Sequence, residues 1–430
     1  MLQMSLTQQE HTRSYYAATA NDATDYPALA GSETADVCVV GAGFTGIATA
    51  LTLAERGYSV AVVEANRVGW GASGRNGGQL IHGMRGLDKI EAKHGDRIAD
   101  LVWDMRWRGN DIVRERVRKY SIDCDLKDGY VEVAMSPRQV ADIEKAAAER
   151  AKRNFPYRYE VWDRQDTREK LGTDAFHGGF ACFRDGHLHP LNLCIGEARA
   201  AADLGVRIFE QSPVLDIEHG KRPKVVTASG QVSADAVVLA GNAYSRLEPR
   251  QLSNLVYPAG SYIIATEPLP EALVGEINPE DVAVCDLNMI VDYYRLSADR
   301  RLLYGGACNY SGRDPANIEA YIRPRMERIY PQLKGVRVEF EWGGNIGIVL
   351  NRVIAVGRLD GNVYYCQGYS GHGVCGTHLM GEVMADAVAG TMERFDLFAG
   401  MKPLRLPGPR WVGNQLIALG MLYYRLRDRL

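Results

Sequence analysis

The sequence has no excess of either charge, no closely spaced cysteines and no long hydrophobic run. Its 50 lysine and arginine residues nearly balance 53 aspartate and glutamate residues, which gives a net charge of -3 at pH 7. Proteins that bind nucleic acid use a basic surface to neutralise phosphates. We therefore expect no nucleic-acid partner, and 46% hydrophobic with 24% charged residues is typical of a globular protein.

The cysteines form no C-x-x-C pair and have no spacing typical of metal ligands. We expect reduced, mostly buried thiols and no metal site. The eight positions are Cys38, Cys124, Cys182, Cys194, Cys285, Cys308, Cys366 and Cys375.

No hydrophobic run approaches the roughly 20 residues that a membrane-spanning helix needs. The first 29 residues lack the charged-then-apolar order of a secretory signal. We therefore expect a cytoplasmic protein without a transmembrane segment. The tail, residues 412–430, mixes apolar residues with three arginines, and we expect it to pack on its own domain or on a partner copy in a homo-oligomer rather than on a membrane surface.

A strand, a glycine turn, a helix and a second strand follow one another near the N-terminus. Residues 37–40 and 59–64 are buried-strand runs, and residues 48–56 have the apolar spacing of a helix. This order predicts a βαβ unit of an α/β fold.

The turn of this unit has the pattern G-x-G-x-x-G, formed by Gly41, Ala42, Gly43, Phe44, Thr45 and Gly46. Its glycines allow a tight turn and a close approach of the backbone to a pyrophosphate at the helix N-terminus. Glu64 ends the second strand 18 residues after Gly46, where an acid hydrogen-bonds a ribose. The carboxylate also disfavours NADP, whose 2′-phosphate it would repel.

A second glycine-rich segment follows at residues 65–79. So many small residues either form a backbone path along an extended ligand or make a flexible surface loop. The candidate cofactor-binding residues are Ala65, Arg67, Gly71, Ala72, Ser73, Arg75, Asn76, Gly77, Gly78 and Gln79. With this segment the sequence resembles the D-amino-acid oxidase and glycine oxidase superfamily of FAD-dependent oxidoreductases, in which it lies along the pyrophosphate and the isoalloxazine face.

A late motif extends the resemblance. Residues 368–373 read GYSGHG and precede a predicted helix, which resembles the flavin-contacting motif of the superfamily. Helix N-terminal amides carry partial positive charge and favour a reduced, anionic flavin. His372 either adds charge or fills space in the turn. The resemblance implies further cofactor contacts at Val214, Gly241, Asn242, Gly371, His372, Gly373 and Val374.

Longer segments, among them YSIDCD at Tyr120, GHLHPLNL at Gly186 and DYYRLSADRRLLYGG at Asp292, resemble amine-oxidising members of the superfamily over essentially the whole chain. The resemblance implies that FAD oxidises the free primary amine of gamma-glutamylputrescine or a related polyamine. Water then hydrolyses the imine to an aldehyde with release of ammonia, and dioxygen takes the electrons to give hydrogen peroxide.

Some members of the superfamily link FAD covalently to a cysteine or histidine, but here no cysteine lies close to the matching site and His82 is not in the expected local pattern. We therefore expect noncovalent FAD.

Two alternatives stay open. One is a dehydrogenase of a secondary amine or D-amino acid that passes electrons to a quinone, and the other is a flavin-binding regulatory protein without turnover. Amino-acid oxidases of the superfamily carry W-x-G-x-R, whose arginine grips the substrate carboxylate. Here Ile346 stands at the arginine position, which favours an amine without a neighbouring carboxylate unless Arg352 reaches in from elsewhere.

Amine oxidation requires a neutral amine, and desolvation provides it. Tyr293, Tyr294 and Trp342 are candidate pocket walls, although each could equally pack in a core. His82 is a candidate polar contact or proton acceptor. Arg295 suits either a distal carboxylate of the substrate or a structural ion pair, and no residue can be named as the catalytic base.

The remaining helical and strand-like stretches predict a second domain inserted into the first. The predicted fold class is α/β, with a Rossmann-type FAD-binding domain and an interleaved α+β substrate domain that carries an antiparallel sheet. The predicted parts are an arm lying on the surface at residues 1–35, an FAD-binding domain at 36–110, 181–250 and 345–398, a substrate domain at 111–180 and 251–344, and a tail with a helix at 399–430.

Overall fold

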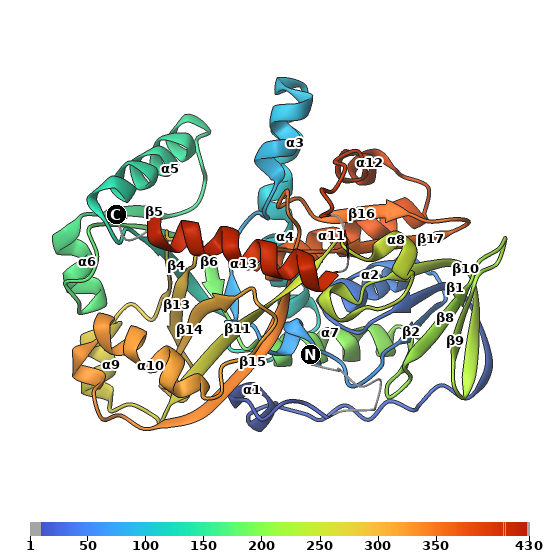
Figure 1. Cartoon of the computed structure of the whole chain (residues 1–430), viewed down its shortest axis with the longest axis horizontal. Helices are drawn as coiled ribbons and strands as arrows, with labels where there is room; N and C mark the ends of the chain where they lie inside the picture. Colours follow the sequence, from blue (N-terminus) through green and yellow to red (C-terminus); the bar gives the residue numbers. More distant parts are fainter. Residues whose placement is uncertain (1–9, 407, 409, 428–430) are drawn as a thin grey trace.

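The computed structural model describes residues 10–406, 408 and 410–427, and its strands form two sheets (Figure 1). The first sheet has the order β16-β17-β10-β1-β2-β7, and β8 and β9 extend it from β10. Its strands are β1 (Gly31–Val40), β2 (Val60–Val63), β7 (Arg207–Phe209), β8 (Val214–Glu218), β9 (Lys224–Thr227), β10 (Gly230–Leu239), β16 (Ala355–Arg358) and β17 (Val363–Gln367).

The centre of this sheet is parallel and buried on both faces. Val39 of β1 pairs with Val62 of β2 and with Val238 of β10. One face packs on the helices α2 (Phe44–Glu55), α4 (Ala99–Lys119), α7 (Pro190–Asp203) and α11 (Val374–Val388). The other face packs on β8, β9 and the segment around α8 (Pro249–Leu252). Continuous apolar runs are what a parallel sheet covered on both faces requires.

The second sheet has the order β15-β11-β14-β13-β12-β4-β6-β3, and β5 pairs with β6. Its pairs are antiparallel except β12 with β4, which is parallel. The strands are β3 (Gln79–Leu80), β4 (Lys127–Val133), β5 (Tyr159–Trp162), β6 (Gly179–His187), β11 (Tyr257–Thr266), β12 (Ala283–Asp286), β13 (Asp292–Leu296), β14 (Leu302–Asn309) and β15 (Val338–Ile348).

Shorter helices surround the two sheets. In Figure 1, α5, α6, α9 and α10 lie around the second sheet, whereas α12 lies beside β16. Their bounds, with those of α1 and α3, are α1 (Tyr15–Ala18), α3 (Leu87–His94), α5 (Val140–Lys152), α6 (Arg164–Leu171), α9 (Glu271–Ile277), α10 (Ile318–Ile329) and α12 (Glu393–Ala399).

The α/β architecture with a Rossmann-type unit is the one that the sequence predicts, but β1 begins earlier than expected. The apolar run starts at Val37, whereas the strand starts at Gly31 and pairs with β10 from Gly230 onward. Its first residues are largely exposed and carry no apolar signal. The predicted arm also contributes to the core, because Tyr16 and Leu29 are buried.

The chain passes between the two sheets four times, which bears on the predicted domain ranges. β1 and β2 belong to the first sheet, β3 to β6 to the second, β7 to β10 to the first, β11 to β15 to the second, and β16 and β17 to the first. β3 falls within the predicted FAD-binding range yet pairs in the second sheet, and β6 and β15 cross predicted boundaries. The division into domains stays a prediction.

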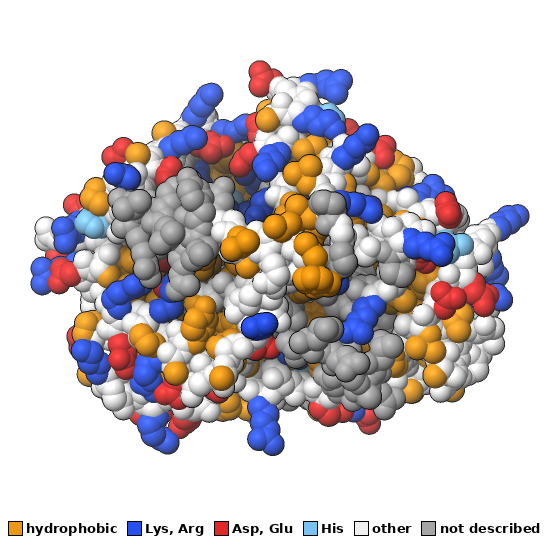
Figure 2. All heavy atoms as spheres, viewed as in Figure 1, with side chains coloured by type: hydrophobic (Ala, Val, Ile, Leu, Met, Phe, Trp, Pro, Cys, Tyr) orange, Lys and Arg blue, Asp and Glu red, His pale blue; other side chains and the backbone are white. Residues whose placement is uncertain are grey.

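Helix α13 (Arg410–Arg427) crosses the face shown in Figure 1. Asn414 donates a hydrogen bond to the Pro258 carbonyl at 3.2 Å, and Met421 is buried against the end of β11. Charges of both signs are interspersed on this face, and hydrophobic side chains gather near its middle (Figure 2). Among the described residues, no helix is long and apolar enough to cross a membrane.

Candidate functional site

A cavity of about 1400 Å³ lies between the two sheets. Its wall includes the ends of β1, β2 and β10 on one side and residues of β4, β12 and β13 on the other. Ligands of open α/β sheets bind outside the carboxyl ends of the strands, where this cavity begins. Its size and length suit a dinucleotide together with a small substrate.

The turn between β1 and α2 leaves little room for a side chain at its three glycines. Gly41 has a φ of +106°, and a Cβ on Gly46 would lie 1.8 Å from the Gly41 carbonyl oxygen. A Cβ on Gly43 would lie 2.9 Å from Ser73 Oγ, which accepts a hydrogen bond from the Phe44 amide at 2.9 Å. The turn therefore brings bare backbone to the cavity at the N-terminus of α2, as binding of a pyrophosphate requires.

Glu64 ties this turn to the end of β2. Its Oε2 accepts a hydrogen bond from the Ala42 amide at 2.7 Å, and its Oε1 accepts one from the Asn66 amide at 2.9 Å. Burial raises the pKa of the Glu64 carboxyl, and these backbone hydrogen bonds oppose that shift. The carboxylate lines the cavity, so it combines support of the turn with an acceptor for a ligand hydroxyl.

The second glycine-rich segment forms the adjoining wall. The Arg75 guanidinium lies 4.4 Å from the Trp70 ring centroid and donates to the Trp70 carbonyl at 2.9 Å and to the Gly343 carbonyl at 3.2 Å. A Cβ on Gly77 would lie 2.5 Å from the Tyr293 ring. The predicted residues of this segment on the cavity wall are Ala65, Gly71, Ala72, Ser73, Arg75, Asn76, Gly77 and Gln79.

The late glycine motif lines the cavity where α11 begins. Gly371 has a φ of +86°, and His372 Nε2 donates a hydrogen bond to the His82 carbonyl at 3.0 Å. Burial, together with the charge of Arg85, lowers the pKa of His372 to about 4. The ring is therefore neutral at pH 7 and adds no charge. Gly371, Gly373, Val374, Val214, Gly241 and Asn242 also line the cavity.

Four predicted cofactor residues do not line the cavity: Ala42, Gly46, Arg67 and Gly78. Ala42 and Gly46 shape the turn from behind. Arg67 binds carboxylates of the protein instead, with Glu210 at 3.0 Å and Glu10 at 3.0 Å. Gly78 packs so closely that a Cβ would lie 2.2 Å from the Leu188 carbonyl oxygen.

The two tyrosine candidates of β13 lie on opposite faces of the second sheet. Tyr293 lines the cavity, and its ring lies between Gly77 and Gly305, where a Cβ on either glycine would lie within 2.5 Å of the ring. Tyr294, the next residue of β13, points to the opposite face, where its hydroxyl bonds that of Tyr330 at 2.7 Å. Successive side chains of a strand alternate, so Tyr294 packs in the core.

Trp342 and Arg295 support the cavity wall from behind. Trp342 is buried and its Nε1 donates to the Arg75 carbonyl at 2.9 Å. Arg295 is also buried, and it donates to the carbonyls of Gly77 at 2.9 Å and of Leu296 at 3.0 Å. Within the described chain it makes no ion pair, which does not support the structural role, and it does not line the cavity, which does not support contact with a substrate carboxylate.

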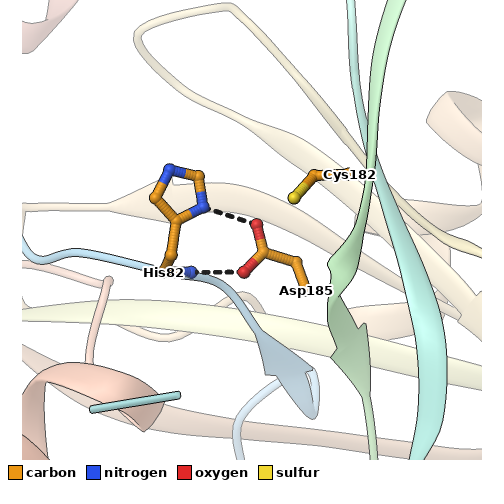
Figure 3. Close-up of side chains that lie close together, drawn as sticks. All are labelled: His82, Cys182 and Asp185. Carbon is orange, nitrogen blue, oxygen red and sulfur yellow. Dashed lines mark hydrogen bonds and ion pairs between the residues drawn. The ribbon is translucent and has the colours of Figure 1, made fainter. Parts of the chain in front are cut away.

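His82 lies outside the cavity wall in a cluster with Cys182 and Asp185 (Figure 3). Asp185 accepts hydrogen bonds from the His82 amide at 2.8 Å and from Nδ1 at 2.5 Å. Arg150 donates to His82 Nε2 at 2.8 Å, which places the ring proton on Nδ1. That proton and the Arg150 cation oppose a metal ion, although potential ligand atoms of the three residues lie within 4.8 Å of one another.

The cavity is also lined by polar and charged residues that the motifs did not indicate. Arg85, Glu132, Asp286 and Tyr310 line it, as does Arg352, which the sequence raised only as an alternative. Burial, followed by the charge of Asp292, raises the pKa of Asp286 to about 7. These residues come from separate strands and loops and share no motif, so the sequence offered no local signal for them.

Comparisons with known proteins identify relatives of this chain. The sequence profile described as FAD dependent oxidoreductase matches residues 36–387. The chain is 45% identical to gamma-glutamylputrescine oxidoreductase of Escherichia coli (strain K12), over 98% of this chain and 99% of that protein. It is 41% identical to a probable oxidoreductase, OrdL, of Haemophilus influenzae, over 99% of both chains.

Solved structures share the fold at lower identity. Glycine oxidase from Geobacillus kaustophilus superposes with a TM-score of 0.71 at 22% identity, over 87% of this chain and 100% of that one. L-proline dehydrogenase from P. horikoshii superposes with a TM-score of 0.69 at 20% identity, over 83% and 94% of the two chains.

Proposed function

Because the chain belongs to the family of FAD-dependent oxidoreductases, we propose that it uses noncovalent FAD to oxidise the primary amine of gamma-glutamylputrescine or a related gamma-glutamylated polyamine. The products are the aldehyde, ammonia and hydrogen peroxide, with dioxygen as electron acceptor. The observation that carries the proposal is the similarity to the Escherichia coli relative over nearly the full length of both chains.

The cavity wall fits FAD. Glu64 would accept a hydrogen bond from the ribose, the turn from Gly41 to Gly46 would take the pyrophosphate, and the N-terminus of α11 would face the pyrimidine part of the flavin. When bound, FAD accepts a hydride from the carbon beside the amine nitrogen. Cys285 and Cys308 line the cavity, and burial raises the pKa of both thiols, which disfavours the thiolate needed for a covalent link.

The protein's own contribution is to hold the amine neutral and oriented. Tyr293 presents an aromatic ring beside Gly77, and burial raises the pKa of its phenol, so that the ring adds no charge. A poorly solvated wall lowers the pKa of an amine, because burial disfavours the charged form. The neutral amine retains the lone pair that drives hydride departure, and the imine is then hydrolysed by water.

The proposal is tested by mixing the FAD-loaded protein anaerobically with gamma-glutamylputrescine, putrescine and several amino acids. Loss of flavin absorbance with the glutamylated amine, followed by one peroxide per turnover on admission of air, is the expected result. Bleaching without peroxide would instead favour transfer to a quinone. Bleaching by amino acids alone would contradict the proposed substrate. If no compound bleached the flavin, the result would favour a flavin-binding protein without turnover.

A further inference from the structure

Two arginines on the cavity wall have no carboxylate partner among the described residues. Arg85 follows β3, and Arg352 follows β15; both line the cavity. In the part of the chain that the structure describes, neither forms an ion pair. Cations on the wall of a binding cavity are commonly matched by an anionic ligand.

The two arginines lie on neighbouring segments. Gly86 has a φ of +95°, and a Cβ there would lie 2.8 Å from Val353 Cα and 3.0 Å from the Arg352 carbonyl oxygen. Nearby, Lys89 donates a hydrogen bond to the Asn351 carbonyl at 2.9 Å. Glycine at position 86 therefore lets the segment after Arg85 pack directly on the backbone of Arg352.

Tyr310 lines the same cavity as both arginines. Burial raises the pKa of Tyr310, while the positive charges of Arg352 and Arg85 oppose that shift. Arg352 also has a φ of +60°, a conformation that residues with a Cβ rarely adopt. Such backbone strain is concentrated at functional sites.

We propose that Arg85 and Arg352, with the Tyr310 hydroxyl, bind the α-carboxylate of the substrate's γ-glutamyl group. This inference rests on the proposed function and names how the same cavity selects its substrate. Ile346 replaces the carboxylate-binding arginine of the W-x-G-x-R pattern, and Arg85 and Arg352 would supply a carboxylate site elsewhere in the cavity. Bidentate geometry makes arginine the side chain best suited to a carboxylate.

The neighbouring acids favour this ligand over a phosphate. Glu132 and Asp286 line the same cavity on the adjacent strands β4 and β12. Their carboxyl groups would repel a dianion but complement the α-ammonium group that accompanies the glutamyl carboxylate. A zwitterionic amino-acid group therefore matches both signs of charge on this wall.

The test uses a ligand that cannot be oxidised, so that it does not depend on turnover. The probe is γ-glutamylbutylamide, which keeps the glutamyl group and lacks the terminal amine. Its binding to the FAD-loaded protein is measured by calorimetry for the wild type, Arg85→Gln, Arg352→Gln and the control Arg313→Gln. Arg313 is an exposed arginine outside the cavity wall. N-butylacetamide, which has no carboxylate, is the matched ligand control.

We expect Arg85→Gln and Arg352→Gln each to weaken binding of γ-glutamylbutylamide by about 10- to 100-fold, as loss of a charge-assisted hydrogen bond implies. Arg313→Gln should bind as the wild type does, and the response to N-butylacetamide should be the same in all four proteins. Wild-type affinity in both cavity variants would overturn the inference. If Arg352→Gln loses FAD, the binding of γ-glutamylbutylamide by Arg85→Gln tests the inference by itself, because the Arg85 side chain is exposed. Failure of flavin bleaching by the amine would overturn the proposed function instead.

Discussion

At the scale of single residues, Gly43 lines the cavity where the proposed function places the pyrophosphate of FAD. Its missing Cβ leaves the space beside Ser73 Oγ, and any side chain would block the approach to the pyrophosphate. We expect Gly43→Val to abolish FAD binding while the chain stays folded. Gly275→Val, at a position with nothing within 4 Å, is the control and should retain FAD. Purified variants are compared by flavin absorbance per protein, and a fully yellow Gly43→Val would exclude this placement of the cofactor.

Asp286 sets an expected pH dependence of stability. Its pKa rises from 3.8 to about 7 on folding, chiefly through burial. Between these values the folded protein holds a proton that the unfolded chain has released, so the free energy of unfolding falls as the pH rises through this window. The full loss in the free energy of unfolding is reached when the pH exceeds the pKa of Asp286 in the folded protein.

Asp286→Asn removes this cost. At pH 8 we expect the variant to gain roughly 1–4 kcal/mol over the wild type, as a shift of this size implies, with a smaller gain at pH 5. Urea unfolding at both pH values measures the difference. Asp216→Asn, an exposed change on β8, controls for the loss of one negative charge. A gain independent of pH would show that Asp286 is ionised at both.

At the scale of elements, α13 depends on close packing against β11. A Cβ on Gly413 would lie 2.3 Å from the buried Tyr257 ring, whereas one on Gly420 in the same helix would meet nothing within 4 Å. We expect Gly413→Ala to destabilise the protein by about 1–3 kcal/mol through overpacking. Gly420→Ala should be neutral or stabilising by up to about 1 kcal/mol. Thermal unfolding compares the two, and equal melting temperatures would mean that α13 tolerates displacement.

The elements also show what the sequence could and could not predict. The βαβ unit and the glycine motifs were predictable because their signals are local: a turn, a helix start and an acid at a fixed spacing. The sequence could not predict which of Tyr293 and Tyr294 lines the cavity, because the alternation of side chains along β13 does not indicate which face of the strand is turned to the cavity. The packing of Gly86 on the backbone of Arg352 was not predictable, since it depends on contact between segments more than 260 residues apart.

At the scale of the whole molecule, we propose that the cavity between the two sheets holds FAD without a covalent bond. The cysteines on its wall, Cys285 and Cys308, are held as thiols by burial. We therefore expect precipitation with acid to release all the FAD into the supernatant and leave a colourless pellet. Absorbance of the two fractions measures this, with the untreated protein as reference. A yellow pellet that resists washing would show a covalent link.

The four passages of the chain between the sheets also constrain how this enzyme can be re-engineered. The second sheet is built from two separate stretches, residues 79–187 and 257–348, each inserted into the sequence of the first sheet. Grafting that sheet from a homologue with another specificity therefore requires four splice points rather than one. Recombination at a single crossover between residues 80 and 348 would combine strands from different parents in both sheets, so chimeras should be designed with matched double insertions.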